Sequence, residues 1–224
     1  MQIRRFAEPA ATFLERPIPT GLSEAEAWFF EPPRPALVLG SAQDVAIADA
    51  AETSAAGLDV VRRRSGGGAV FVDPGRSLWL DVIVPPADPR WSADVRKASH
   101  WLGHAWATAL RTVGIHGEVY DEGLEKTPWG RLVCFGANGP GEVLIDGRKT
   151  VGIAQRRTRD GARFQCIVYD RWDPRDVVDH LALNLDERDR IAADLADVAT
   201  GVGDRLLALR DAITAELLDD RPMH

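Results

Sequence analysis

Short apolar segments alternate along the chain with longer segments of helical periodicity. Apolar runs predict strands over residues 35–40, 58–61, 78–84, 115–120, 132–135 and 163–169. Apolar residues at helical spacing predict helices over residues 46–56, 91–113, 177–185, 189–199 and 204–218. A further short helix is expected after Ser23, because Glu26 follows it at capping-box spacing. The mixture predicts an α+β (mixed α/β) fold with a mixed sheet.

The apolar alternation over residues 143–153 is interrupted by Asp146-Gly147, a dipeptide typical of tight β-hairpins. Lys149 therefore begins the return strand, and the small residues Gly152 and Ala154 follow it. A lysine at this place could reach over a pocket floored by small side chains. As a compact cation it could stabilise charge that develops on a phosphate or a thioester.

Residues 62–71 read Arg-Arg-Arg-Ser-Gly-Gly-Gly-Ala-Val-Phe, so three cations run directly into three glycines between strand-like segments. Glycines weaken a strand, and close approach of a ligand to the backbone is the usual reason for them. Freed N–H groups could face an anion, while the arginines supply charge and forked donors. The alternative is a hairpin turn with a solvated basic flank.

The composition of the chain limits the kinds of partner that it could bind. A length of 224 residues with 45% apolar content fits one globular domain. The net charge of −7 argues against nucleic acid as a partner, although arginines cluster at 62–64 and 156–159. The second cluster could contact an acidic carrier domain or a phosphate, or be solvated. With two cysteines, no signal-peptide pattern and no membrane-spanning stretch, a cytoplasmic protein without a membrane partner is expected.

Residues 62–71 and 147–154 together resemble the signature of the lipoate–protein ligase and octanoyltransferase family, which is related to biotin–protein ligases. Residues 37–43 also resemble a strand–Gly–x–x–Gln turn of this family. The resemblance implies a class II synthetase-like catalytic domain, with a central mixed sheet flanked by helices. It implies a single domain over residues 1–224 and no accessory C-terminal domain. A biotin ligase is less favoured, because arginine and glycine interleave in its loop.

The resemblance implies that a lipoyl or octanoyl group is joined to a lysine of a lipoyl carrier domain. Carriers of this kind are the E2 subunits of 2-oxoacid dehydrogenases and the glycine-cleavage H protein. In a ligase, ATP and Mg²⁺ would activate lipoate or octanoate as an acyl-adenylate, with Lys149 acting between the acyl carbonyl and the phosphate. The residues expected to hold the adenylate are Arg63, Ser65, Gly66, Gly67, Gly68, Ala69, Gly152 and Ala154. No permanently bound cofactor and no metal ligand is expected.

A second route uses a thioester. Cys134 would take octanoyl from acyl carrier protein and pass it to the target lysine, with Lys149 nearby to favour the thiolate. The alternative for Cys134 is a small buried apolar residue, as expected for Cys166. A third hypothesis is a module that binds an acyl-adenylate or a carrier domain without turnover. The chain departs from the usual ligase pattern at Gly141-Glu142, where an Asn-Asp pair is common, and at Val72, where His is common.

Overall fold

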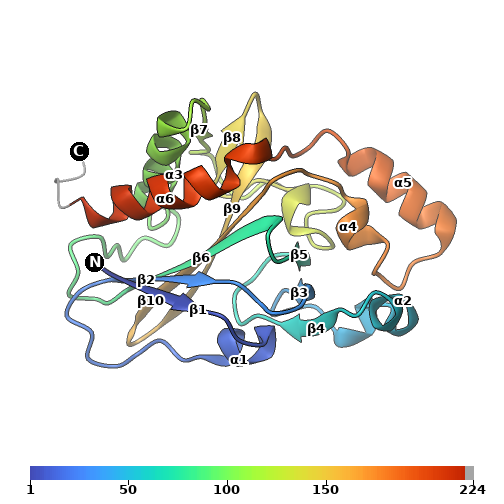
Figure 1. Ribbon diagram of the computed structural model, residues 1–224, viewed down its shortest axis with the longest axis horizontal. Helices are drawn as coiled ribbons and strands as arrows, with labels where there is room; N and C mark the ends of the chain where they lie inside the picture. The colour runs from blue at the N-terminus through green and yellow to red at the C-terminus, as the bar shows by residue number, and fades with distance from the viewer. Residues whose placement is uncertain (220–224) are drawn as a thin grey trace.

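Two β-sheets organise the chain in the computed structural model, which describes residues 1–219 (Figure 1). The larger sheet contains, in spatial order, β1 (Gln2–Phe6), β2 (Glu26–Phe30), β6 (Ser77–Val84), β10 (Gly161–Tyr169), β9 (Arg148–Thr158), β8 (Val143–Ile145) and β7 (Glu118–Val119). The smaller sheet contains β4 (Asp59–Arg62), β3 (Ala36–Leu39) and β5 (Val70–Val72). Each sheet has one parallel pair, β1–β2 or β3–β4, beside antiparallel pairs. The predicted mixed α+β fold is therefore confirmed.

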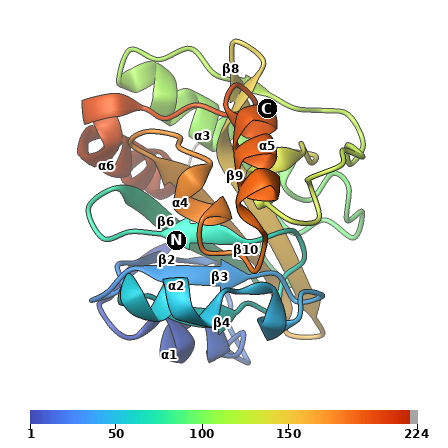
Figure 2. The same cartoon turned by 90° about the vertical axis from the view of Figure 1, so that its right-hand side faces the viewer.

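Helices cover the sheets on both sides. The helices are α1 (Ala10–Glu15), α2 (Ala50–Ala55), α3 (His100–Thr112), α4 (Arg175–Val178), α5 (Leu185–Leu195) and α6 (Leu206–Leu218), and the short 3₁₀ turns are η1 (Val45–Ile47), η2 (Cys134–Gly136) and η3 (Gly203–Arg205). In Figure 2, α3 and α6 lie on one face of the large sheet, and the small sheet and α1 lie on the other.

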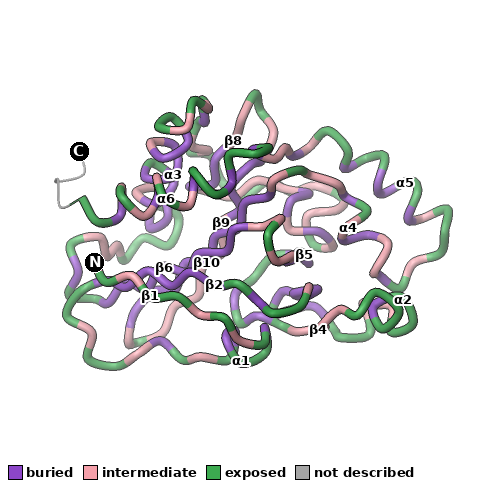
Figure 3. The backbone as a smooth tube through the Cα atoms, viewed as in Figure 1, coloured by how far each residue is buried: buried purple, intermediate pink, exposed green. Residues whose placement is uncertain are grey.

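The two faces of the large sheet pack into two separate hydrophobic cores, because successive side chains of a strand point to opposite sides. Leu80 and Val82 of β6 pack with α3 and α6. Trp79 and Ile83 of the same strand pack with Phe13 of α1 and with the small sheet. Figure 3 shows the central strands β6 and β10 as buried along nearly all of their length. Apolar runs correctly predicted three strands that are buried on both faces, β3, β6 and β10.

The helix expected after Ser23 is wrong, because residues 26–30 form the buried strand β2. The aromatic run of this segment is divided between the two cores, and such a division requires the two-sided alternation of a strand. Glu26 does not cap a helix. Its carboxylate accepts hydrogen bonds from Trp28 Nε1 at 2.7 Å and from Arg4 at 2.8 Å.

Three other expected elements differ in extent or type. The helix expected over 91–113 begins at His100, and Val95, the first residue of the predicted apolar pattern, is 52% exposed. The helix expected over 46–56 is broken, because Asp49 caps a new helix by accepting from the N–H groups of Ala51 and Glu52. Residues 132–135 form no strand: Val133 makes one bridge to Ala69, and the turn η2 begins at Cys134.

The helices expected over 177–185 and 189–199 are α4 and α5, shifted toward the N-terminus, because Asn184 forms a capping box with Glu187. The Asp146-Gly147 hairpin is confirmed. Both residues have positive φ, 49° and 75°, as a type I′ turn requires. None of the helices in residues 1–219 is long and apolar enough to cross a membrane.

Gly40, at the end of β3, allows two loops to touch. A Cβ atom at this position would overlap the carbonyl oxygen of Gly67 in the glycine loop. The side chain of Gln43 fixes the same turn: its Oε1 accepts from the N–H of Gly40 at 2.8 Å, and its Nε2 donates to the carbonyls of Arg131 and Leu132 at 3.0 Å. The turn that resembles the family pattern therefore positions the glycine loop.

We expect Gly40→Ala to lower the free energy of unfolding by about 1–3 kcal/mol, because the overlapping atom belongs to backbone that has to shift. Gly66→Ala is the matched control. A Cβ at Gly66 meets nothing within 4 Å, so its effect should stay within about 0.5 kcal/mol. Urea unfolding of both variants measures the difference, and equal effects would contradict the close approach of the two loops.

Candidate active site

The glycine loop, residues 65–69 between β4 and β5, is held from inside by the guanidinium of Arg63. This side chain is only 2% exposed. Its Nη2 donates to the carbonyls of Gly66 and Gly68, both at 2.9 Å, and its Nε donates to Gly66 at 3.2 Å. The same Nη2 lies 3.6 Å from Cys134 Sγ. Arg63 therefore stabilises the loop, and its expected role as a donor to a ligand stays a prediction.

Ser65 fastens the loop to the large sheet. Its hydroxyl donates to Gln165 Oε1 at 2.6 Å, and Gln165 Nε2 donates to Asp81 at 3.3 Å. Asp81 also pairs with Arg163, which reaches the main chain of the α1 segment. Burial raises the pKa of the Asp81 carboxyl, while Arg163 acts in the opposite direction. The expected contact of Ser65 with a ligand also stays a prediction.

Lys149 is almost fully buried, with 1% of its surface exposed. Its Nζ lies 2.6 Å from Glu142 Oε1 and donates to the carbonyls of Cys134 at 3.0 Å and Ala137 at 2.8 Å. An ammonium group has three N–H donors, so these three partners use all of them. Lys149 therefore joins strand β9 to the η2 loop that carries Cys134.

Glu142 is the residue that the sequence interpretation missed. Besides pairing with Lys149, its Oε1 accepts from the N–H of Ile153 at 3.0 Å and its Oε2 from the N–H of Gly139 at 2.7 Å. Burial raises the pKa of the Glu142 carboxyl, and Lys149 and the two N–H groups oppose that rise. A lone acid directly before a buried strand, opposite a lysine across a hairpin, is the signal that could have found it.

One cavity of about 200 Å³ brings several predicted residues together. Its lining includes five of them: Gly66, Gly67, Cys134, Lys149 and Ala154. Glu142, Ser99, Leu124, Gly130, Ala137, Gly139, Pro140, Ile153 and Gln155 complete the lining. The cavity thus combines a partly exposed thiol, a paired ammonium group and two glycines of the loop.

The remaining predicted residues lie behind this lining. A Cβ at Gly68 would lie 2.7 Å from the main chain of Val133, and Ala69 bridges to the same residue. Gly152 lies under the ring of Phe135, where a Cβ would come within 3.0 Å of a ring carbon. These residues shape the site by allowing close packing. Cys166 is fully buried, and burial raises the pKa of its thiol, which agrees with the expected structural role.

Residues 14–204 match the model of the lipoyl protein ligase A/B catalytic domain. The chain belongs to this family. The octanoyltransferase LipM of Carboxydothermus hydrogenoformans is 31% identical over 133 residues, which are 59% of this chain and 48% of that protein. The LipM protein of Staphylococcus aureus is 31% identical over 111 residues, 46% of this chain and 38% of its own length. The matches therefore span less than half the length of these curated relatives.

Solved structures share the fold. A bipartite lipoate protein ligase from Thermoplasma acidophilum has a TM-score of 0.75 and 17% identity, over 96% of this chain and 81% of that chain. A lipoate–protein ligase A bound with ATP has a TM-score of 0.66 and 18% identity, over 97% and 84%. The expected family and the expected fold of its catalytic domain are thus confirmed.

The Glu142–Lys149 pair should show strong energetic coupling. Lys149→Met and Glu142→Gln should each lower the free energy of unfolding by about 3–5 kcal/mol, because each leaves a buried group without its partner. The double variant should lose much less than the sum of the two. Chemical denaturation in a double-mutant cycle measures the coupling.

The exposed pair Arg175–Asp189, also 2.6 Å apart, is the control for this cycle. Because solvent screens that pair, its own cycle should show little coupling. Additive losses for Glu142 and Lys149 would contradict the pairing in the cavity.

Proposed function

We propose that this chain transfers an octanoyl group to a lysine of a lipoyl carrier domain through a thioester on Cys134. Cys134 lines the same cavity as Lys149, Gly66 and Gly67, so a nucleophile, a cation and main-chain groups meet around one space. The curated relatives matched above carry the name octanoyltransferase, which supports the same chemistry.

The contacts of Lys149 are our reason for preferring thioester chemistry to adenylate chemistry. Its three donors are taken by Glu142 and two carbonyls, and the carboxylate balances its charge. A neutral pair without a free donor offers little stabilisation to an acyl-phosphate. The same contacts fix the carbonyl of Cys134, and hence the loop that presents the thiol. The geometry therefore supports chemistry at Cys134 better than a phosphate-binding role for Lys149.

The reaction would proceed in two transfers. The Cys134 thiolate attacks the carbonyl of an octanoyl thioester, the donor's carbon–sulfur bond breaks, and the departing donor thiolate takes up the proton that Cys134 lost. The amine of the target lysine then attacks the Cys134 thioester. The amide forms, and the Cys134 sulfur leaves and accepts the proton of the amine. The backbone at Gly66 and Gly67 is our candidate for stabilising the oxyanion in both steps.

ATP-dependent lipoate ligation is the second candidate. The arginine–glycine motif and the ATP-bound structural neighbour favour it, and a further neighbour, LipL1 of P. falciparum, was solved in complex with lipoate. ATP would bring Mg²⁺ on its phosphates. In residues 1–219 no group of three His, Cys, Asp or Glu side chains could hold a metal ion. The Thermoplasma ligase is described with its E2 lipoyl domain, which supports a lipoyl domain as acceptor here as well.

Intact-mass spectrometry after incubation with octanoyl carrier protein, without a lysine acceptor, tests the thioester. We expect a mass increase of one octanoyl group on the wild-type protein and on Cys166→Ala, whose thiol is buried. Cys134→Ser should lose the adduct and lower the rate of transfer to an acceptor domain by on the order of 10³-fold or more. An adduct that persists in Cys134→Ala, which has no group to acylate at this position, would exclude Cys134 as the nucleophile.

Pyrophosphate release in the presence of ATP, Mg²⁺ and lipoate tests the ligase. We expect none above background, because Lys149 is already neutralised. Release that continues in Cys134→Ser and stops in Lys149→Ala would favour the ligase instead. A protein that binds acyl-AMP but gives neither an adduct nor pyrophosphate would be the non-catalytic binding module. Circular dichroism of each variant confirms that it is folded.

A further inference from the structure

Two arginines that the proposed chemistry does not use lie next to cavity-lining segments in the chain. Arg64 directly precedes Ser65 and the cavity-lining Gly66, and it is exposed. Arg156 directly follows the cavity-lining Gln155 on β9, and it is half-buried. We call Arg64 and Arg156 the rim arginines. They come from separate segments of the chain. The hydrogen bond of Ser65 to Gln165 holds the first segment against β10, and β10 pairs with β9, which carries Arg156.

The rim arginines repel each other. Burial lowers the pKa of Arg156, and the positive charges of Arg64 and Arg163 lower it further. Arg163, its neighbour across the β9–β10 ladder, has its own charge balanced by Asp81. No Asp or Glu side chain within residues 1–219 forms an ion pair with Arg64 or Arg156.

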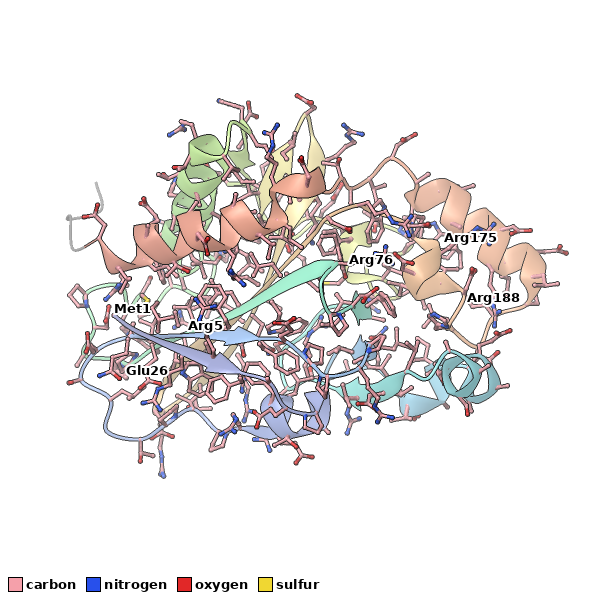
Figure 4. The ribbon with its side chains drawn as sticks, viewed as in Figure 1. Met1, Arg5, Glu26, Arg76, Arg175 and Arg188 are labelled. Atoms are coloured by element: carbon pink, nitrogen blue, oxygen red, sulfur yellow. The ribbon has the colours of Figure 1, made fainter. Side chains whose placement is uncertain are left out.

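Many arginines elsewhere in residues 1–219 form ion pairs, although several, Arg111 among them, form none. Arg76, Arg175 and Arg188, labelled in Figure 4, each pair with one or more carboxylates. The chain has 34 acidic residues against 27 basic ones, so partners are plentiful. Repulsion between like charges without a counter-charge destabilises the folded protein. An anionic surface bound against them would offset that repulsion.

The reach of the target lysine indicates which partner supplies that surface. A lysine side chain is a four-carbon stem ending in an ammonium group. The domain that carries it must therefore rest on the rim of the cavity when its amine approaches Cys134. Residues beside that lysine would then face Arg64 and Arg156, and arginine binds carboxylates through two parallel hydrogen bonds.

We infer that the rim arginines are the docking site for acidic residues that flank the target lysine on the acceptor domain. The inference rests on the proposed function, since that function supplies the lysine. Electrostatic docking of this kind raises both the rate of encounter and the affinity, and added salt weakens both effects.

Binding of an unmodified lipoyl acceptor domain to the Cys134→Ala protein, measured by calorimetry, tests the inference without turnover. Arg64→Glu and Arg156→Glu should each raise the Kd about tenfold or more, and raising the salt from about 50 mM to about 500 mM should remove most of the difference. Arg111→Glu changes the net charge equally at an exposed position of α3 and should leave the Kd unchanged. Wild-type affinity in both rim variants would overturn the inference.

A charge swap makes the test specific. Acceptor variants whose acidic residues beside the target lysine are changed to arginine should bind the wild-type protein poorly and regain affinity for Arg64→Glu/Arg156→Glu. No recovery with any such variant would overturn the contact. If the rim variants slow octanoylation of Cys134 by the donor while acceptor affinity is unchanged, the arginines serve the donor carrier and the inference is wrong. A protein that never forms the Cys134 adduct refutes the proposed function alone, because acceptor binding is measured separately.

Discussion

A buried ammonium group fixes the arrangement of this site. Taking a charge out of water is costly unless it is paired and hydrogen-bonded, so Lys149 requires all of its partners. Glu142 reaches it from the segment before β8, and the carbonyls of Cys134 and Ala137 reach it from the η2 loop. The η2 loop is thereby held against the β8–β9 hairpin around one cavity, with the thiol of Cys134 on its wall.

The glycine loop, residues 65–69, is also held in place by a buried cation. Three consecutive arginines have three different fates: Arg62 ends β4 in solvent, Arg63 is buried under the loop, and Arg64 is exposed again at the rim. The three cations are therefore not one phosphate-binding cluster. One of them stabilises the loop by binding its carbonyls.

In the proposed function, the local state of Lys149 favours one of two ways of activating an acyl group. A free, unbalanced ammonium suits a phosphate, whereas a balanced and fully bonded one suits the positioning of a neighbouring loop. In this chain Glu142 balances Lys149, at the place where the ligase pattern commonly has an Asn-Asp pair. In the proposed function, this one buried acidic residue is what favours chemistry at Cys134.

The sequence by itself determined the elements whose patterns are local. The central strands are apolar on both faces, and the Asp146-Gly147 hairpin needs only its own positive φ angles. The sequence motifs were also enough to identify the family. Only the tertiary structure decided that residues after Ser23 form a strand, that Glu142 is the partner of Lys149, and that Arg63 and Arg64 separate into loop and rim. Those outcomes depend on which faces meet across the fold, and burial against distant segments outweighs local preference there.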